Sequence, residues 1–384
     1  MSENSKGSGM YGQRRRNQFG SPTGIGSIGG SDAGCGDRAA QNKSPDFAEQ
    51  AKSAANKVSD TLSKTVGIEK LEGFSLKALF ADVFKKHPEE EVERIFMYGT
   101  PETTPDIRDV DTSWPRPWIF TRALIASVAI YWVLHTGFDR TGNIFLLPSM
   151  MFIGSFAVPM SALIFFIESN VRRNVSLYQV FRAGLVCGVI GIVWASFTWK
   201  IFSSENNYVI AFLAGLIEEP VKLAALWKCR SLLKLRYIHN GLLVGAGLGA
   251  GFAAFESMGY AFVYVLDGNR ISDMETVILL RGVFAPFGHI IWTAIVCAAL
   301  WRVKGSASFK LDMLVDKRFL RLAALPVVLH ILWDLPPIPV VDAIPFLRYV
   351  VLGIVGWAAV LSLIQEGLKE IRKEKSLYLG QWNK

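Results

Sequence analysis

The sequence predicts an all-α polytopic membrane protein, a helical bundle of about eight transmembrane helices with a cytoplasmic N-terminal extension. Two observations predict this class. Apolar residues make up 51% of the 384 residues, and the mean hydropathy is +0.29. The apolar residues also gather into long windows, and about 20 of them in a row cross a bilayer core of roughly 30 Å. The eight windows are 117–138, 145–167, 178–199, 208–228, 240–266, 277–300, 320–339 and 345–365.

The basic residues support the same span count and indicate an orientation. Lys and Arg concentrate in the cytoplasmic loops of membrane proteins. With eight spans, both termini share one side with the loops after the second, fourth and sixth windows, and these segments carry most of the Lys and Arg. The opposite loops carry little beyond Arg140, Lys200, Arg270 and Arg348. Both termini are therefore expected in the cytoplasm, and this distribution explains the net charge of +8 without a nucleic-acid partner.

The segments outside the windows differ in composition. Residues 1–45 are rich in Gly and Ser without apolar periodicity, which is typical of a disordered tail. Residues 46–97 carry apolar residues at helical spacing and are expected to form short amphipathic cytoplasmic helices, either as a small subdomain or along the membrane surface. Residues 98–116 read as a proline-rich linker into the membrane domain, 117–367, and a basic tail, 368–384, follows it.

Ionisable residues lie near the middle of four successive windows. Each costs roughly 2.5–3.5 kcal/mol on insertion scales, so it is a functional candidate by default. A side chain at this depth cannot reach the interface as one near a helix end can. We therefore expect these groups to meet one another or a water-filled cavity. They are Glu218 and Glu219 in the fourth window, Glu256 in the fifth, His289 in the sixth, and His330 with Asp334 in the seventh.

Helical spacing indicates which of these groups share a face. Glu218 and Glu219 precede Lys222 by four and three residues, so the ammonium group can neutralise either carboxylate. His330 and Asp334 are four residues apart, the spacing at which a carboxylate can fix the tautomer of an imidazole. The spacing thus predicts two charged faces, one in the fourth window and one in the seventh.

A row of small residues runs along the fifth window. Gly241, Gly245 and Gly249 form a ridge that allows a neighbouring helix to approach closely. Helical steps continue this ridge through Phe252 to Glu256. We expect the ridge to press the Glu256 carboxylate against its neighbour, with the fourth window as the expected neighbour.

Together the mid-window residues named above, with Lys222, make a cluster of four carboxylates, one Lys and two His. That is too much negative charge for a dry site, so at least one carboxyl is expected to be protonated or bound to a cation. One ionised and one protonated carboxyl suit general base and general acid chemistry. Imidazoles can donate to an oxyanion, orient water or bind a metal. Hydrolysis of a peptide bond inside a membrane needs these parts.

Four short motifs carry a family resemblance. "EEPVK" at 218–222 matches an EExxK signature, "FAAFE" at 252–256 matches FxxxE, and the later histidines lie in "GHIIWT" and "HILWD". Over roughly residues 120–365 the chain resembles the PrsW family of intramembrane proteases, relatives of the CAAX-processing and bacteriocin-processing (CPBP/Abi) membrane proteases.

The resemblance implies roles for individual residues. Glu218 and Glu219 would be the catalytic glutamates, one of them activating water. His330, with His289, would contact that water or the oxyanion, and Glu256 would be the carboxylate of the second motif. Lys222, Asp334 and Phe252 fit as supporting residues around them. Whether Zn²⁺ is bound stays open, because related enzymes have been described both as metal-dependent and as glutamic.

The resemblance also implies a function. The chain would be an intramembrane endopeptidase of the bacterial cytoplasmic membrane, acting on membrane-protein substrates such as single-span anti-sigma factors. One alternative is a proton-coupled transporter or channel, because these also use midplane Glu and His. Transporters often carry inverted repeats with broken helices at matching positions, whereas the ionisable residues here crowd into windows four to seven. The other alternative is an inactive membrane scaffold, which would be expected to have lost motif residues, and all are present.

Overall fold

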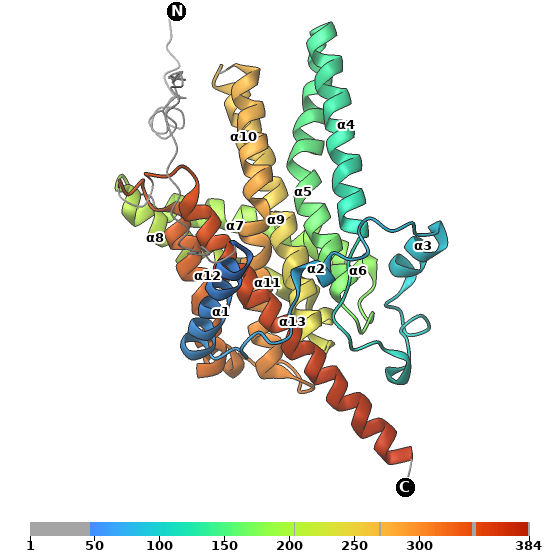
Figure 1. The fold of residues 1–384 in the computed structure, drawn as a ribbon. Helices are drawn as coiled ribbons and strands as arrows, with labels where there is room; N and C mark the ends of the chain where they lie inside the picture. The colour runs from blue at the N-terminus through green and yellow to red at the C-terminus, as the bar shows by residue number, and fades with distance from the viewer. Residues whose placement is uncertain (1–46, 203, 269, 340–342, 383–384) are drawn as a thin grey trace, which may run out of the picture.

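The computed structural model describes residues 47–382 except 203, 269 and 340–342, so the predicted tail 1–45 lies outside the described residues. The described residues form helices and no strands, which confirms the all-α class (Figure 1). Among them, six helices or helix runs are long and apolar enough to cross a membrane. These are Ile119–Thr141, Ile144–Ser169, Leu177–Ile201, Ile238–Leu266, Ile271–Lys304 and Leu347–Gly380.

The two remaining apolar windows also form helices. α8 (Asn207–Ala225) covers the fourth window and α12 (Lys317–Asp334) the seventh. Both carry several ionisable residues, which lower their hydropathy. The structure therefore confirms a polytopic helical bundle, and the count of eight spans is not confirmed.

The other membrane helices follow in chain order. They are α4 (Ile119–Thr141), α5 (Leu147–Ser169), α6 (Leu177–Arg182), the π-helical turn η3 (Ala183–Cys187), α7 (Gly188–Ile201), α9 (Ile238–Leu266), α10 (Ile271–Phe284), the 3₁₀ turn η5 (Ala285–Phe287), α11 (His289–Lys304) and α13 (Leu347–Trp382). Figure 1 shows α4, α5 and α10 projecting together at one end of the molecule, while the C-terminal part of α13 projects from the opposite end. The predicted basic tail, as far as it is described, continues α13 as helix.

α9 lies at the centre of the bundle because glycines on two of its faces admit two neighbours. Gly241, Gly245 and Gly249 meet α11, where a Cβ on Gly241 would lie 2.9 Å from the Ala298 Cα. On another face, a Cβ on Gly251 would collide with the Gly184 carbonyl in η3. The expectation that the ridge of Gly241, Gly245 and Gly249 packs on the fourth window is wrong. α11 is the neighbour, because small residues such as Ala298 face the ridge and let the two backbones approach.

Gly249→Ala is expected to destabilise the protein by about 1–3 kcal/mol. The new Cβ would collide with the His289 carbonyl and lie 2.8 Å from the Ile290 Cα, and backbone atoms cannot turn aside. Gly259→Ala is the matched control on α9, because a Cβ there meets nothing within 4 Å. The free energy of unfolding in mixed micelles measures both variants. Equal losses in the two would contradict the close approach of α9 and α11.

The N-terminal region is fastened to the membrane bundle. It contains α1 (Phe47–Val66), α2 (Leu76–Leu79), α3 (Glu89–Met97) and the 3₁₀ turn η1 (Ile107–Asp109). Leu62 and Ile68 are buried in the main core. The Glu69 and Glu72 backbone N–H groups donate to the Glu366 and Gln365 side chains of α13, at 2.6 and 2.7 Å. Residues next to α1 therefore share the core of the bundle.

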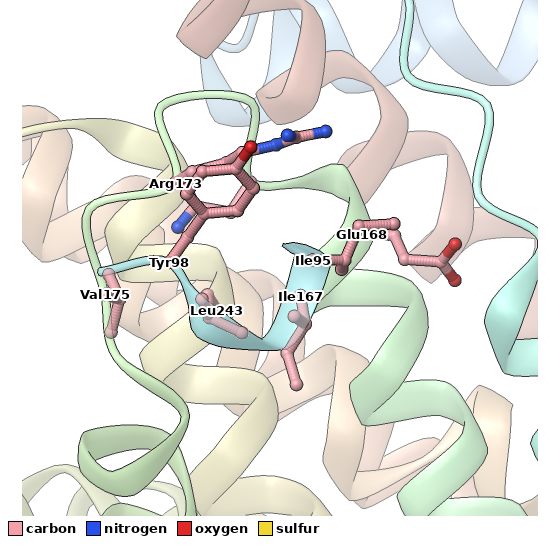
Figure 2. A pocket seen from close by; sticks show the side chains of 8 residues that line it. Ile95, Tyr98, Ile167, Glu168, Arg173, Val175 and Leu243 are labelled. Atoms are coloured by element: carbon pink, nitrogen blue, oxygen red, sulfur yellow. The ribbon is translucent and has the colours of Figure 1, made fainter. Parts of the chain in front are cut away.

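A small cavity lies where this region meets α5 and α9 (Figure 2). Its rim carries Tyr98 and Arg173, whose guanidinium carbon is 4.6 Å from the Tyr98 ring centroid. Its volume of about 30 Å³ is enough to hold water. Leu243 lines the cavity and precedes Glu256 by thirteen residues, roughly 20 Å along α9. The cavity is therefore separate from the cluster of ionisable residues.

Candidate active site

α8 supplies the centre of the ionisable cluster. Glu218, Glu219 and Lys222 are all buried, with 7%, 1% and 1% of their surface exposed. The Lys222 Nζ lies 2.7 Å from Glu219 Oε1 and 3.6 Å from Glu218 Oε2. One ammonium group therefore lies beside two carboxylates and can neutralise either of them, as the spacing predicts, and burial makes these charges depend on one another.

His289 stands at a break in the helix run that forms the sixth window. The run stops at η5, and Gly288 has the non-helical angles φ −110° and ψ −134°. The Pro286 carbonyl in this break accepts a hydrogen bond from Trp357 Nε1 at 3.0 Å, so α13 holds the break in place. α11 then begins at His289. The Nδ1 of His289 lies 2.9 Å from Lys222 Nζ, and its Nε2 lies 3.1 Å from Glu256 Oε2.

His330 reaches the same centre from α12. Its Nδ1 lies 3.1 Å from Glu219 Oε1, and its Nε2 lies 3.4 Å from Asp334 Oδ2 and 3.8 Å from Glu218 Oε2. The Trp292 ring stacks on the imidazole, with centroids 4.5 Å apart. The Asp334 side chain is 40% exposed against 3% for His330, so Asp334 lies at the rim of the cluster.

The start of α12 is fixed by its own cap. Asp316 accepts hydrogen bonds from the Arg318 backbone N–H at 2.7 Å and from its Nε at 3.1 Å. These bonds, the side-chain one foremost, lower the pKa of Asp316 to about 2, so the cap stays ionised at neutral pH. An ionised N-cap stabilises the first turn of the helix that carries His330.

Glu219 is the most engaged residue of the cluster. Its Oε1 accepts from Lys222 Nζ and contacts His330 Nδ1, and its Oε2 accepts from the Thr293 hydroxyl at 3.4 Å. Glu218 differs, because its buried Oε2 has no hydrogen-bond partner among the described residues. The two adjacent glutamates are therefore chemically distinct, which the motif alone does not show.

Glu256 approaches the cluster through His289 and not through the glutamate pair. Its Oε2 accepts from Arg281 Nη2 of α10 at 2.6 Å. Phe252, one turn earlier, has its ring centroid 4.2 Å from Lys222 Nζ, a cation–π contact. The structure thus brings all eight residues predicted from the sequence into one cluster.

Arg281, Thr293 and Trp292 contact the cluster but are not among the site residues predicted from the sequence. Arg281 had a signal, because it is an ionisable residue inside an apolar window, and such residues are functional candidates. Trp292 and Thr293 also had one, because both lie inside the motif "GHIIWT", of which only the histidine was taken as a site residue.

The family model for PrsW family intramembrane metalloproteases matches residues 174–362. Over this segment the chain belongs to the PrsW family. The matched segment contains every residue of the cluster, from Glu218 to Asp334. Together with its apolar helices, this places the chain among integral membrane proteins of a protease family. Searches of the curated proteins and of the solved structures found no significant match.

The name of the PrsW family implies a metal, and the cluster contains a residue set that fits one. Glu218, His289 and His330 each offer a ligand atom, and these atoms lie within 4.8 Å of one another. Two imidazoles and one carboxylate form a common ligand set of catalytic zinc. The unpartnered Oε2 of Glu218 also fits a cation ligand. Lys222 Nζ lies next to two of these residues, so a divalent cation would compete with its ammonium group for them.

Proposed function

We propose that this PrsW family chain is an intramembrane endopeptidase that hydrolyses a peptide bond of membrane-protein substrates, with a glutamate of α8 activating the attacking water. One observation carries the proposal. Glu218 Oε2 is a buried carboxylate oxygen without a hydrogen-bond partner among the described residues, and it faces Lys222 Nζ at 3.6 Å and His330 Nε2 at 3.8 Å. A base needs an uncommitted lone pair next to groups that stabilise the charge that develops.

The contacts of the two glutamates support a division of roles. Both oxygens of Glu219 already accept hydrogen bonds, from Lys222 and from Thr293, so Glu219 holds the cluster together. Glu218 Oε2 takes a proton from water as the water oxygen attacks the scissile carbonyl carbon. The oxyanion that forms accepts hydrogen bonds from cationic or N–H donors such as Lys222. Glu218 then returns the proton to the leaving amine as the C–N bond breaks.

Glu218, His289 and His330 are also the residues that would hold a divalent metal, which would polarise a carbonyl and lower the pKa of water. Metal analysis of the purified, active protein separates the two roles of Glu218. Stoichiometric metal that is lost in Glu218→Gln would assign Glu218 as a ligand.

The proposed substrates are single-span regulatory proteins such as anti-sigma factors, and the proposed location is the bacterial cytoplasmic membrane with both termini in the cytoplasm. The orientation is supported by the position of the basic loops. Arg236, before α9, pairs with Glu374 near the end of α13 at 3.0 Å. Arg302, at the end of α11, donates to the Gly67 carbonyl next to α1 at 2.7 Å. The basic segments thus lie on one side with α1 and the end of α13.

The test is co-expression of tagged single-span membrane proteins with the wild type, Glu218→Gln and Glu219→Gln. Wild-type membranes should contain substrate fragments that both variants lack. Glu275→Gln is the matched control, because this partly buried carboxylate bonds His135 and lies six residues before Arg281, roughly 9 Å along α10. Identical fragment patterns in all four strains would contradict the proposal.

Asp334→Asn is expected to reduce kcat/KM about 10-fold, and His330→Ala about 100-fold or more. Asp334 lies at the exposed rim of the cluster, and its Oδ2 is 3.4 Å from His330 Nε2. It therefore orients the imidazole ring without touching Glu219. His330 contacts Glu219 directly and is buried. Steady-state cleavage of one substrate in proteoliposomes measures both variants. A loss in Asp334→Asn that equals the loss in His330→Ala would place Asp334 among the reacting groups.

A further inference from the structure

Arg281 is held in one position by α9. Its Nη2 donates to Glu256 Oε2 at 2.6 Å, and its Nε donates to the Ser257 hydroxyl at 2.9 Å. Its guanidinium carbon lies 4.4 Å from the Tyr260 ring centroid. A planar guanidinium with these three contacts has a defined orientation, which a lysine ammonium would not have. Arg281 therefore fixes the Glu256 carboxylate from α10.

The fixed carboxylate determines which nitrogen of His289 carries hydrogen. Glu256 Oε2 lies 3.1 Å from His289 Nε2, and an ionised carboxylate can only accept hydrogen bonds. Nε2 must then be the N–H donor. In the neutral ring this leaves the lone pair on Nδ1, which lies 2.9 Å from Lys222 Nζ, a group that can only donate while it is an ammonium. The opposite tautomer would place two donors against each other and two acceptors against each other.

We propose that Arg281 is a positioning residue that acts through Glu256 to hold His289 in its Nε2–H tautomer, with the Nδ1 lone pair facing Lys222 and the glutamate pair. Nδ1 lies 3.9 Å from Glu219 Oε1, so this lone pair is presented to the centre of the cluster. A carboxylate that fixes the tautomer of an imidazole is the usual way in which proteins prepare this ring to accept a proton, accept a hydrogen bond or bind a metal.

Arg281 lies on the more exposed side of the cluster, where packing alone does not hold the Glu256 carboxylate in place. The side chains of Arg281, Glu256 and His289 are 29%, 22% and 13% exposed, whereas Glu219 is 1% exposed. Packing immobilises Glu219 on all sides. Glu256 has open space beside it and would lose its direction without the guanidinium. The effect on catalysis rests on the proposed protease function, whereas the tautomer does not.

The tautomer can be measured without protease activity. The chain has five histidines, so ¹⁵N-histidine labelling gives few signals, and those of His289 are assigned by their loss in His289→Gln. In the wild type, the ¹⁵N shifts of His289 are expected to show a protonated Nε2 and an unprotonated Nδ1. Arg281→Met should lose this single pattern and give shifts averaged between tautomers. Arg281→Lys should show the wild-type pattern only in part, because a lysine ammonium is less firmly oriented than a guanidinium. If Arg281→Met does not fold, the His289 shifts of Arg281→Lys are compared with those of the wild type instead.

Arg270→Met is the matched control, because this arginine precedes the same helix, has an 85% exposed side chain and pairs with Asp273. It should leave the His289 shifts unchanged. In cleavage assays Arg281→Met should lower kcat about 10- to 100-fold with little change in KM. Wild-type His289 shifts in both Arg281 variants would overturn the inference. If instead Glu218→Gln cleaves normally while the Arg281→Met shifts change, the proposed role of Glu218 as the base fails and the positioning role of Arg281 stands.

Discussion

Glu218→Gln is expected to lower kcat/KM by about 10²- to 10⁴-fold while the free energy of unfolding hardly changes. The amide cannot take a proton from water, so the reaction loses its base. It fills the same volume, and the replaced Oε2 makes no hydrogen bond within the described residues, so folding loses no bond there.

Glu219→Gln provides the contrast. This substitution removes the carboxylate at 2.7 Å from Lys222 Nζ, so it should lower stability as well as activity. Cleavage kinetics in proteoliposomes and unfolding in mixed micelles, measured on the same preparations, test the pair. An unstable Glu218→Gln beside a stable Glu219→Gln would mean that the two roles are reversed.

Lys222→Met is expected to destabilise the protein by roughly 3–5 kcal/mol and to abolish cleavage. Met fills the space of the lysine stem, so the loss is due to charge. Glu218 and Glu219 would lie adjacent and buried without the ammonium group between them. Removing one partner of a buried ion pair is costly because the other charge stays behind.

The double variant Lys222→Met with Glu219→Gln tests this reason. It should regain part of the lost stability, because one of the two uncompensated carboxylates is gone, but no activity. Lys369→Met is the surface control, since this lysine pairs with Glu69 at 2.6 Å with a side chain that is 47% exposed. Its loss should stay below about 1 kcal/mol. A double variant as unstable as Lys222→Met would show that packing, and not charge, carries the effect.

The helices and the residues of the cluster could be predicted from the sequence, because each follows from the free-energy cost of placing an unpaired polar group in a membrane. A long apolar window satisfies its backbone in a membrane only as a helix. A carboxylate at mid-depth such as Glu219 needs a partner, and Lys222 and His330 were the groups within reach. These arguments predict that ionisable residues meet, whichever helices bring them together.

The pairings within the cluster could not be predicted in the same way. A glycine ridge shows that some backbone comes close, but the choice of α11 depends on small residues such as Ala298 opposite Gly241. Glu256 had several cationic or imidazole groups as possible partners, and in the structure it meets Arg281 of α10 and His289 at the start of α11. The fastening of Glu69 to Glu366 joins residues 297 positions apart, and no periodicity reports such a contact.

The contacts of Glu69 and Glu72 with α13 determine where the chain can be truncated without loss of stability. The family match ends at residue 362, just before Gln365 and Glu366, which receive the N–H groups of Glu72 and Glu69. A chain cut back to its first membrane helix would leave the nearly buried Glu366 with Arg302 as its cation but without a backbone donor. It would also uncover the apolar surface that Leu62 and Ile68 close. Chimeras that exchange the catalytic segment between proteins must therefore carry α1 and the residues that follow it.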